Sequence, residues 1–397
     1  MDESGAIVSF DDIPKWLVNR QKNDLYRRRR VVENPQGREL RVAGKRLLNF
    51  CSNDYLGLAS DPRVSEAFKS GVDRWGVGAG ASHLICGHTG AHHELEEELA
   101  AFVGRPRALL FSSGYAANMG TINSLVSEGD WVFEDRLNHA SLLDGGWISR
   151  AKFTWFEHHD AGDLARQLTA SNGVAGRRLV VSDGTFSMDG DTCALDELIA
   201  VAGAHGGWVM IDDAHGLGVH GKNGCGLVDP ERYTTRDVPV LVGTLGKALG
   251  TAGAFVAGEE SLIELLIHKA RNYVFSTAIP SAVAVATSKS LEIAATEGWR
   301  RVHLEALIGR FTAGVANIGL GFGGSTSPIQ PLIVGPADRA VRLSLALEER
   351  GILVSAIRPP TVPDGASRLR ITITAAHTDE DVDRLLDALA GTCDGVV

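Results

Sequence analysis

The stretch Met210-Ile211-Asp212-Asp213-Ala214-His215-Gly216 decides the fold class of this chain. It completes an apolar run that begins at Trp208 and does not alternate with polar residues, which predicts a strand buried on both faces of a sheet. Runs of the same character cover 108–111, 131–133, 178–181, 240–242 and 254–256, and each is predicted to be a parallel strand. Helical patterns over 93–102, 115–127 and 195–204 lie among them. The chain is therefore predicted to be an α/β protein with an open, mostly parallel sheet and right-handed crossovers.

A lysine among small residues follows this strand. Lys247 lies 35 residues after Asp212, in Gly243-Thr244-Leu245-Gly246-Lys247-Ala248. A lysine amine that has lost its proton can form a Schiff base with an aldehyde, and an ionised acid can keep a pyridine nitrogen protonated. The protonated ring then accepts electrons from a reacting carbon. The pairing of Lys247 with Asp212 therefore predicts a pyridoxal 5'-phosphate enzyme.

Bulk properties narrow the class of protein. The 397 residues can bury a large core, and the formal net charge of −10 argues against nucleic acid as a partner. No apolar run reaches the roughly 18–20 residues that span a bilayer, and the N-terminus lacks the pattern of a signal peptide. We therefore expect a cytoplasmic protein that does not bind membranes. The five cysteines are widely spaced without a C-x-x-C pair, so we expect reduced thiols and no structural metal.

The chain is expected to form three segments. Residues 1–50 are predicted to be an N-terminal helix and a hairpin, with the turn at Asn34–Gly37. Residues 51–285 are predicted to be the large cofactor-binding α/β domain. Residues 286–397 are predicted to be a small C-terminal α+β domain. Its expected elements are helices over 291–317, 338–350 and 379–389 and extended segments over 329–334, 351–354 and 368–373.

Polar and small residues follow several predicted strands, where ligands bind in an open α/β sheet. Ser113, Gly114 and Tyr115 open a helix whose N-terminus can face a phosphate, although an ordinary strand–helix turn explains them equally well. His139 can stack on an aromatic ring or remain a surface residue. Ser187 can bond a ring hydroxyl or cap a turn. Thr244 can reach a phosphate through its hydroxyl group.

Other readings of these motifs are weaker. Asp212 and His215 alone could be two metal ligands, but no further ligand follows at metal-site spacing. Gly243–Lys247 has G-x-x-G-K instead of the longer P-loop spacing, and it lacks the following Ser or Thr. Gly76–Gly80 follows a helix, so it is not a dinucleotide fingerprint. The basic run Arg27–Arg30 is either a solvated helix end or a binding site for a carboxylate or phosphate.

Together these segments resemble the α-oxoamine synthases, a branch of the fold-type-I pyridoxal-phosphate enzymes. The resemblance rests on Asn53–Leu58, Ser113–Asn118, Asn138–Ser141, Phe186–Asp191, Asp212–Gly216 and Gly243–Lys247, which occur in the family's order over nearly the whole chain. The C-terminal segments Ile329–Gly335, Ala356–Pro363, Arg368–Arg370 and Thr374–His377 are most similar to the branch that acts in biotin biosynthesis. The fold implied is that of a fold-type-I transferase, with a large sheet domain and a small C-terminal domain.

The resemblance also implies a reaction and roles for residues. The expected activity is a decarboxylating condensation of L-alanine with a pimeloyl thioester, on coenzyme A or acyl carrier protein, in a homodimer. Lys247, Asp212, His215 and His139 are implied as catalytic residues. The cofactor would be held by these four and by Ser113, Gly114, Tyr115, Ser187, Thr244, Ser276 and Thr277, the last two reaching a neighbouring subunit's phosphate. Arg358 with Asn53 is implied to hold the amino-acid carboxylate, and Arg27, Thr361 and His139 match further substrate-binding positions.

The sequence departs from the family pattern at two places. Asp183-Gly184 stands where relatives often have Glu-Gly, and Ser82-His83 stands where many have an arginine. Two sister activities remain open, those of 2-amino-3-ketobutyrate ligase and 5-aminolevulinate synthase. A non-catalytic subunit with the same fold is the alternative of a different class, but such a chain would be expected to lack Lys247.

Overall fold

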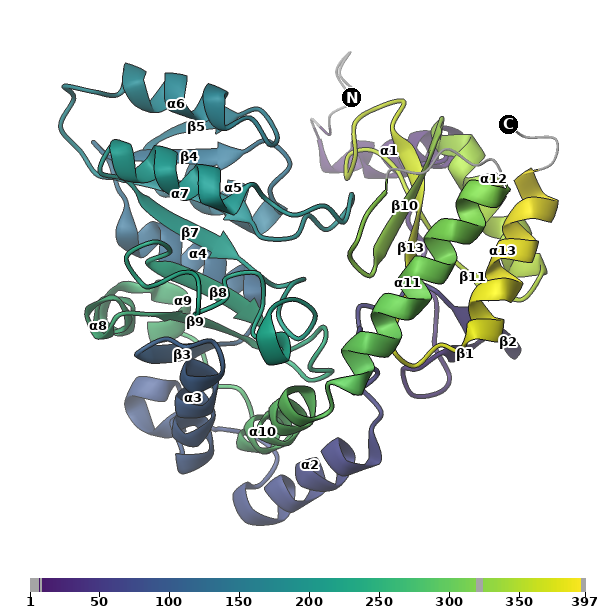
Figure 1. Cartoon of the computed structure of the whole chain (residues 1–397), viewed down its shortest axis with the longest axis horizontal. Helices are drawn as coiled ribbons and strands as arrows, with labels where there is room; N and C mark the ends of the chain where they lie inside the picture. The colour runs from purple at the N-terminus through teal and green to yellow at the C-terminus, as the bar shows by residue number, and fades with distance from the viewer. Residues whose placement is uncertain (1–6, 8, 319–323, 394–397) are drawn as a thin grey trace. The chain divides into compact units, whose positions relative to one another are not determined.

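The computed structural model describes residues 7, 9–318 and 324–393, which form two compact units (Figure 1). One unit comprises the described residues of Met1–Asn53, Met188–Gly190 and His303–Val397. The other comprises Asp54–Ser187 and Asp191–Val302. The boundaries expected from the sequence, after residue 50 and after residue 285, stay a prediction. No helix within the described ranges combines the length and the apolar character that crossing a membrane requires.

The larger unit is built on a seven-stranded sheet with the order β3-β9-β8-β7-β6-β4-β5. Its strands are β3 (Arg107–Phe111), β4 (Trp131–Asp135), β5 (Lys152–Phe156), β6 (Arg178–Asp183), β7 (Trp208–Asp212), β8 (Val240–Thr244) and β9 (Ala254–Gly258). The pairs β4–β5, β4–β6, β6–β7 and β7–β8 are parallel, as the apolar runs predicted. All six predicted strands are present. The edge strand β5 was not predicted, because its half-exposed residues form no apolar run.

The prediction that 254–256 is a parallel strand was wrong. β9 pairs antiparallel with both β3 and β8. The nine residues between Thr244 and Ala254 are too few for a crossover helix, because a parallel connection needs about a dozen or more residues. Instead the loop closes on itself, with the Leu245 N–H donating to Gly253 O at 2.9 Å. An apolar run reports burial on both faces and carries no information about strand direction.

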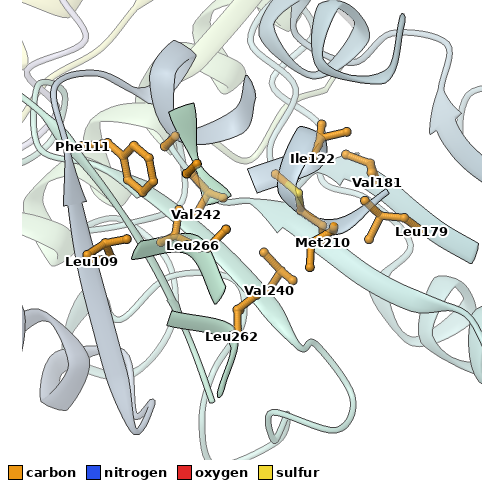
Figure 2. Packing of buried hydrophobic residues seen from close by; sticks show 14 of the residues in the cluster. Leu109, Phe111, Ile122, Leu179, Val181, Met210, Val240, Val242, Leu262 and Leu266 are labelled. Carbon is orange, nitrogen blue, oxygen red and sulfur yellow. The ribbon is translucent and has the colours of Figure 1, made fainter. Parts of the chain in front are cut away.

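One face of this sheet packs on helices through a continuous apolar core (Figure 2). Alternate strand residues such as Leu179 and Val181 contribute to it together with Met210, because side chains alternate between the faces of a strand. The covering helices are α4 (Gly114–Leu125), α5 (Ala140–Ile148), α8 (Glu260–Lys269) and α9 (Arg271–Val274). Ile122 of α4 is among the residues of this core. The remaining helices of the unit are α2 (Pro62–Trp75), α3 (Gly90–Phe102), α6 (Ala161–Ala170), α7 (Leu195–Ala204) and α10 (Ser281–Thr296), with short turns at His83–Gly87 and Lys222–Gly224.

The predicted continuous helix over 291–317 was wrong in one respect. Helix α10 ends at Thr296, and α11 (Trp299–Asn317) begins after Glu297 and Gly298. Glycine disfavours a helix interior, and the Gly298 carbonyl instead accepts the N–H of Val302 in the first turn of α11. The Glu297 carboxylate receives the side chains of Arg63 and Arg300, which holds the break in place.

The other unit contains two three-stranded sheets. One has the order β1-β2-β11, from β1 (Glu39–Val42), β2 (Lys45–Asn49) and β11 (Ile352–Leu353). The other has the order β10-β13-β12, from β10 (Ile329–Gly335), β13 (Ser367–Thr372) and β12 (Ser355–Ile357). Its helices are α1 (Ile13–Lys22), α12 (Ala337–Glu349), α13 (Asp379–Cys393), most of α11 and a short turn at Phe10–Asp12. Apart from the break in the predicted helix over 291–317, the predicted C-terminal strands and helices are present within these bounds.

The N-terminal hairpin turns at a different place from the prediction. Its two-residue turn is Ala43-Gly44, with φ of 49° and 75°, and Val42 pairs with Lys45. Positive φ at both central residues matches the right-handed twist of a hairpin. The predicted turn at Asn34–Gly37 instead precedes β1, where Val32 forms an isolated bridge with Val42.

Candidate active site

Three strand ends place polar side chains on one face of the larger sheet. Val181, Met210 and Val242 belong to the core beneath α4, and the residue two positions later on each strand points the same way. Those residues are Asp183, Asp212 and Thr244, and Asp183 pairs directly with Asp212 across β6 and β7. The apolar strands therefore bring two carboxyl groups and a hydroxyl together at the C-terminal ends of β6, β7 and β8.

These residues line a cavity of about 190 Å³. Its lining residues are Gly114, Tyr115, Asn118, His139, Ser141, Asp183, Ser187, Asp212, Ala214, His215, Thr244 and Lys247. All of them belong to the larger unit. Eight of the residues that the sequence analysis named as catalytic or cofactor-binding are thus brought together: Gly114, Tyr115, His139, Ser187, Asp212, His215, Thr244 and Lys247.

The N-terminus of α4 forms one wall of the cavity. Ser113 caps this helix, since its Oγ accepts the N–H of Ala116 at 3.2 Å. A Cβ atom built at Gly114 would meet no atom within 4 Å, so there is open space where the helix begins. Unpaired N–H groups at a helix N-terminus attract anions such as phosphate. The next residue, Tyr115, donates its hydroxyl to Asp144.

Lys247 begins a chain of three side chains. Its Nζ lies 2.8 Å from His215 Nε2, and His215 Nδ1 lies 2.6 Å from the hydroxyl of Tyr55. Tyr55 is fully buried and His215 nearly so. Because both ring nitrogens of His215 have defined neighbours, the imidazole has one orientation. The tyrosine hydroxyl can therefore select which imidazole nitrogen carries the proton.

Asp212 is held by two donors. Asn118 Nδ2 donates to its Oδ2 at 2.6 Å, and the backbone N–H of Ala214 donates to its Oδ1 at 3.0 Å. Asn118 lies on α4 and also donates to Ser141 Oγ at 2.9 Å, which lies 2.7 Å from His139 Nδ1. The helix thus connects the carboxylate at the end of β7 with the histidine that caps α5.

Asp183, one of the two departures from the family pattern, has a defined role in the structure. Its Oδ2 accepts the backbone N–H of His139 at 2.7 Å, so the shorter side chain still makes this bond. Burial, together with the neighbouring Asp212 charge, raises the pKa of Asp183 well above its usual value. Burial lowers the pKa of His139 and the Lys247 charge acts in the same direction, while the Asp212 charge opposes them. Two adjacent carboxyl groups with different environments are a common means of fixing proton positions in an active site.

The other departure, His83, lies elsewhere in the larger unit. It is buried and stacks on Tyr273 with ring centroids 4.9 Å apart, and its Nδ1 lies 3.0 Å from His88 Nδ1. Burial lowers the pKa of His83 to about 3, and the nearby His92 and His88 charges act in the same direction. A neutral histidine in this position cannot replace the charge of an arginine.

Apart from His139, which lines the cavity, the expected substrate-binding residues lie in the other unit. Arg27 Nη2 donates to Thr361 Oγ1 at 3.2 Å, and Arg358 donates to the carbonyl of Asp24. Burial lowers the pKa of Arg358, and the neighbouring Arg27 charge adds to this effect. Asn53 Oδ1 accepts two bonds from Arg370, each at 3.2 Å. Arg27, Arg358 and Thr361 are therefore close neighbours within this unit.

Three predicted cofactor contacts do not line the cavity: Ser113, which caps α4, and Ser276 and Thr277. Ser276 and Thr277 follow α9, and Thr277 is exposed and forms an isolated bridge with Ser82. Tyr55, Asn118 and Ser141 belong to motifs quoted from the sequence, but no role was predicted for them. Their contacts join residues 23 to 160 positions apart, so spacing along the chain gave no signal of them.

The residues of the cavity fit pyridoxal 5'-phosphate. They supply an amine, a carboxylate, an imidazole beside the amine and open space at a helix N-terminus. Residues 45–389 match the family model of class I and II aminotransferases. The solved structure of serine palmitoyltransferase from Sphingomonas wittichii is 30% identical, covers 98% of this chain and 99% of its own, and has a TM-score of 0.92. The S. paucimobilis enzyme, solved with PLP and myriocin, has a TM-score of 0.91 at 29% identity and 98% coverage of both chains. The fold and the site thus define a fold-type-I, pyridoxal-phosphate-dependent transferase.

Curated relatives give the particular family. The 8-amino-7-oxononanoate synthase of Stutzerimonas stutzeri is 58% identical over 379 residues, which cover 96% of each chain. That of Nitrosococcus oceani is also 58% identical and covers 94% of this chain and 98% of its own. A solved structure of the Francisella tularensis enzyme has a TM-score of 0.76 at 30% identity, covering 88% of this chain and 98% of its own. The chain belongs to the family of 8-amino-7-oxononanoate synthases.

Proposed function

We propose that this protein condenses L-alanine with a pimeloyl thioester, with loss of CO2 and free thiol, to give 8-amino-7-oxononanoate for biotin biosynthesis. The observation that carries this proposal is the 58% identity with 8-amino-7-oxononanoate synthases over nearly the full chain. The cavity supports it, because Lys247 and Asp212 line one space at the strand ends. The protein works as a cytoplasmic homodimer.

In this proposal the cavity residues divide the work. Bound pyridoxal 5'-phosphate supplies an electron sink that spreads the negative charge left on the alanine Cα. Lys247 would hold the cofactor covalently until the alanine amine displaces it, and its freed Nζ would then take the Cα proton. His215 Nε2, 2.8 Å from Nζ, fixes the position of the amine during this transfer. Asp212, held by Asn118 and Ala214, would pair with the ring nitrogen. His139 would stack on the ring, and Ser187 with His215 would contact its oxygen.

Further residues bind the phosphate and the substrates. Ser113, Gly114, Tyr115 and Thr244 bind the phosphate with the α4 N-terminus. Ser276 and Thr277 bind the phosphate of the neighbouring subunit. Arg358 pairs with the alanine carboxylate, with Asn53 nearby, while Arg27, Thr361 and His139 contact the acyl substrate. An arginine fork suits a carboxylate because two parallel hydrogen bonds fix its orientation.

A substrate panel tests the reaction. The purified protein is given alanine, glycine or serine with pimeloyl-, acetyl-, succinyl- or palmitoyl-coenzyme A, and the released thiol is measured. Alanine with pimeloyl-coenzyme A should react best. Pimeloyl-acyl carrier protein in place of pimeloyl-coenzyme A shows which carrier is preferred. Glycine with acetyl- or succinyl-coenzyme A as the best pair would instead assign one of the sister activities.

A second measurement tests the class of enzyme. The wild type should retain pyridoxal 5'-phosphate through gel filtration and absorb visible light, and Lys247→Ala should lose the covalently held fraction. A wild type that takes up no pyridoxal 5'-phosphate would contradict the proposed chemistry and would favour a non-catalytic subunit.

A further inference from the structure

Two histidines and two aspartates form a compact cluster outside the cavity lining. His158 and His159 follow β5, Asp135 ends β4, and Asp191 follows the loop that contains Ser187. His158 Nε2 lies 2.9 Å and His159 Nε2 lies 2.8 Å from the same atom, Asp191 Oδ2. Two imidazoles from adjacent positions therefore converge on one carboxylate oxygen.

The far side of His158 has the partner that a metal-binding histidine requires. Its Nδ1 lies 3.0 and 3.1 Å from the two carboxylate oxygens of Asp135. A carboxylate on one ring nitrogen fixes the proton there and leaves the lone pair of the other nitrogen for a metal, an arrangement found around most metal-bound histidines. Without a cation, His158 has to carry a proton on both nitrogens to make the same contacts.

The spacing and the charges of the cluster fit a divalent ion. Ligand atoms about 2.1 Å from an ion lie ~3.0 Å apart at right angles and ~3.4 Å apart in a tetrahedral site, so both contacts on Asp191 Oδ2 would lengthen slightly when an ion binds. The three ligand atoms of His158, His159 and Asp191 all lie within 4.8 Å of one another. Two carboxylates and two neutral imidazoles would balance a charge of +2. The other oxygen of Asp191, Oδ1, is shielded from solvent and has no hydrogen-bond partner in the described part of the chain.

The backbone conformation of His159 and the packing of Phe186 also support an ion-binding arrangement of the cluster. His159 has a φ of 58°, a region that residues other than glycine seldom adopt, and this conformation presents its ring to Asp191. Phe186 packs edge-on against His158, with ring centroids 4.5 Å apart, and covers one side of the cluster. A partly apolar surrounding strengthens the interaction between an ion and its ligands.

We propose that His158, His159 and Asp191 bind a divalent transition-metal ion, with Asp135 positioning His158. Two imidazoles and one carboxylate suit zinc, cobalt or nickel better than magnesium or calcium, which prefer oxygen ligands. The ion joins the segments that follow β5 and β6, and His158 links it to Asp135 at the end of β4. The chain leads from β4 to His139 and from β6 to Ser187, so the ion stiffens the loops that carry these two cavity residues.

Equilibrium dialysis of the tag-free holoenzyme against Co2+ or Zn2+, after removal of metal with a chelator, tests this site. We expect about one ion per chain in the wild type, and at least tenfold weaker binding in His159→Asn and Asp191→Asn. His159→Asn is the milder change, because asparagine also tolerates a positive φ. His205→Asn is the matched control, since His205 is partly exposed and lies 3.2 Å from Asn172 Oδ1 outside the cluster.

Thermal unfolding gives a second, independent readout. Saturating Zn2+ should raise the unfolding temperature of the wild type and of His205→Asn, because an ion that binds only the folded state stabilises it. The same concentration of ion should raise the unfolding temperature of His159→Asn by clearly less, because its binding is weaker. Absence of a bound ion in the wild type, or equal binding in the wild type and His159→Asn, would overturn the proposal and identify the cluster as a set of ion pairs. If Asp191→Asn does not fold, His159→Asn still decides between these results.

Discussion

At the scale of single residues, the cavity is governed by partners that lie behind the residues facing it. His215 faces Lys247 with one nitrogen and Tyr55 with the other, and Asp183 holds the backbone of His139. Each of these supporting groups is buried, and each fixes the orientation of a neighbour. We therefore expect substitutions behind the cavity to alter catalysis as clearly as those at its surface.

Tyr55→Phe tests this expectation at His215. The change removes the hydroxyl 2.6 Å from His215 Nδ1 and leaves the ring volume in place. We expect kcat to fall about tenfold with little change in KM, and the pH profile of kcat to move, since the hydroxyl no longer selects the imidazole tautomer. The loss of stability should be about 1 kcal/mol.

Tyr233→Phe is the matched control for Tyr55→Phe. Its hydroxyl donates to Asp196 Oδ1 at 2.8 Å and it does not line the cavity. We expect a similar small loss of stability, with kcat and its pH profile unchanged. If the two variants lose activity equally, Tyr55 has only a structural role.

The pH dependence of the free energy of unfolding should reveal the raised pKa of Glu134. Burial raises the pKa of Glu134 to about 8, although Asn138 donates to its carboxylate. In the unfolded chain the group ionises near its usual value of 4.5. The folded state therefore binds the proton more tightly, and the stability from this group is complete below pH 4.5 and is lost as the pH rises through about 8.

Glu134→Gln mimics the protonated side chain and cannot ionise. The free energy of unfolding of the variant minus that of the wild type should therefore increase between pH 5 and pH 9, by on the order of 3 kcal/mol. Urea unfolding at a series of pH values measures this difference. Other buried acids, such as Asp213, titrate in both proteins and cancel. A difference that does not vary with pH would show that Glu134 is ionised in the folded protein.

At the scale of elements, helix α4 connects the core with the cavity. Its N-terminus and Asn118 face the cavity, while Ile122 lies in the core shown in Figure 2. Gly120, between them, lets the helix approach its neighbours closely. A Cβ at this position would lie 2.6 Å from Asn272 Oδ1 and 3.2 Å from a ring carbon of Phe111. The position of Asn118 therefore depends on a residue that has no side chain.

Gly120→Ala should destabilise the protein by about 1–3 kcal/mol. The free-energy cost of overpacking against Asn272 and Phe111 exceeds the gain of roughly 1 kcal/mol from the higher helix propensity of alanine. The substitution should also lower activity, since α4 shifts and moves Asn118. Gly309→Ala in α11 is the matched control. A Cβ there meets nothing within 4 Å, so the same substitution should stabilise. Thermal unfolding and thiol release measure both effects, and stabilisation by both variants would contradict the packing argument.

The elements also show what the sequence could and could not predict. Apolar runs located six of the seven strands of the large sheet, because burial on both faces leaves a clear pattern. The same pattern could not give the direction of β9 or reveal β5, whose residues are half exposed. Lys247, Asp212 and His215 were predicted from motifs, since they follow strands in the chain. Tyr55 and Asn118 were not assigned roles, because folding alone brings them to these partners.

At the scale of the whole molecule, Ser276 and Thr277 bear on the proposed homodimer, because their expected contact is the phosphate of the neighbouring subunit. Neither lines the cavity of its own subunit, and Thr277 is exposed beside Ser82. In the homodimer proposed above, each subunit supplies Lys247 to its own cavity and Thr277 to the neighbouring one. Because a two-fold dimer repeats each contact twice, damage to the two kinds of residue can be separated into different subunits.

Mixed dimers test this sharing. Lys247→Ala removes the amine from its own cavity, and Thr277→Glu places a negative charge where a neighbour's phosphate would lie, so each variant alone should be almost inactive. When both are co-expressed, half of the dimers should contain one chain of each kind, and one cavity in each of these retains both Lys247 and Thr277. Activity should therefore return to about a quarter of the wild-type value. Thr277→Ser, which keeps the hydroxyl without added charge, should be active alone and serves as the control. A mixture no more active than the two separate variants would mean that Thr277 serves no neighbouring cavity.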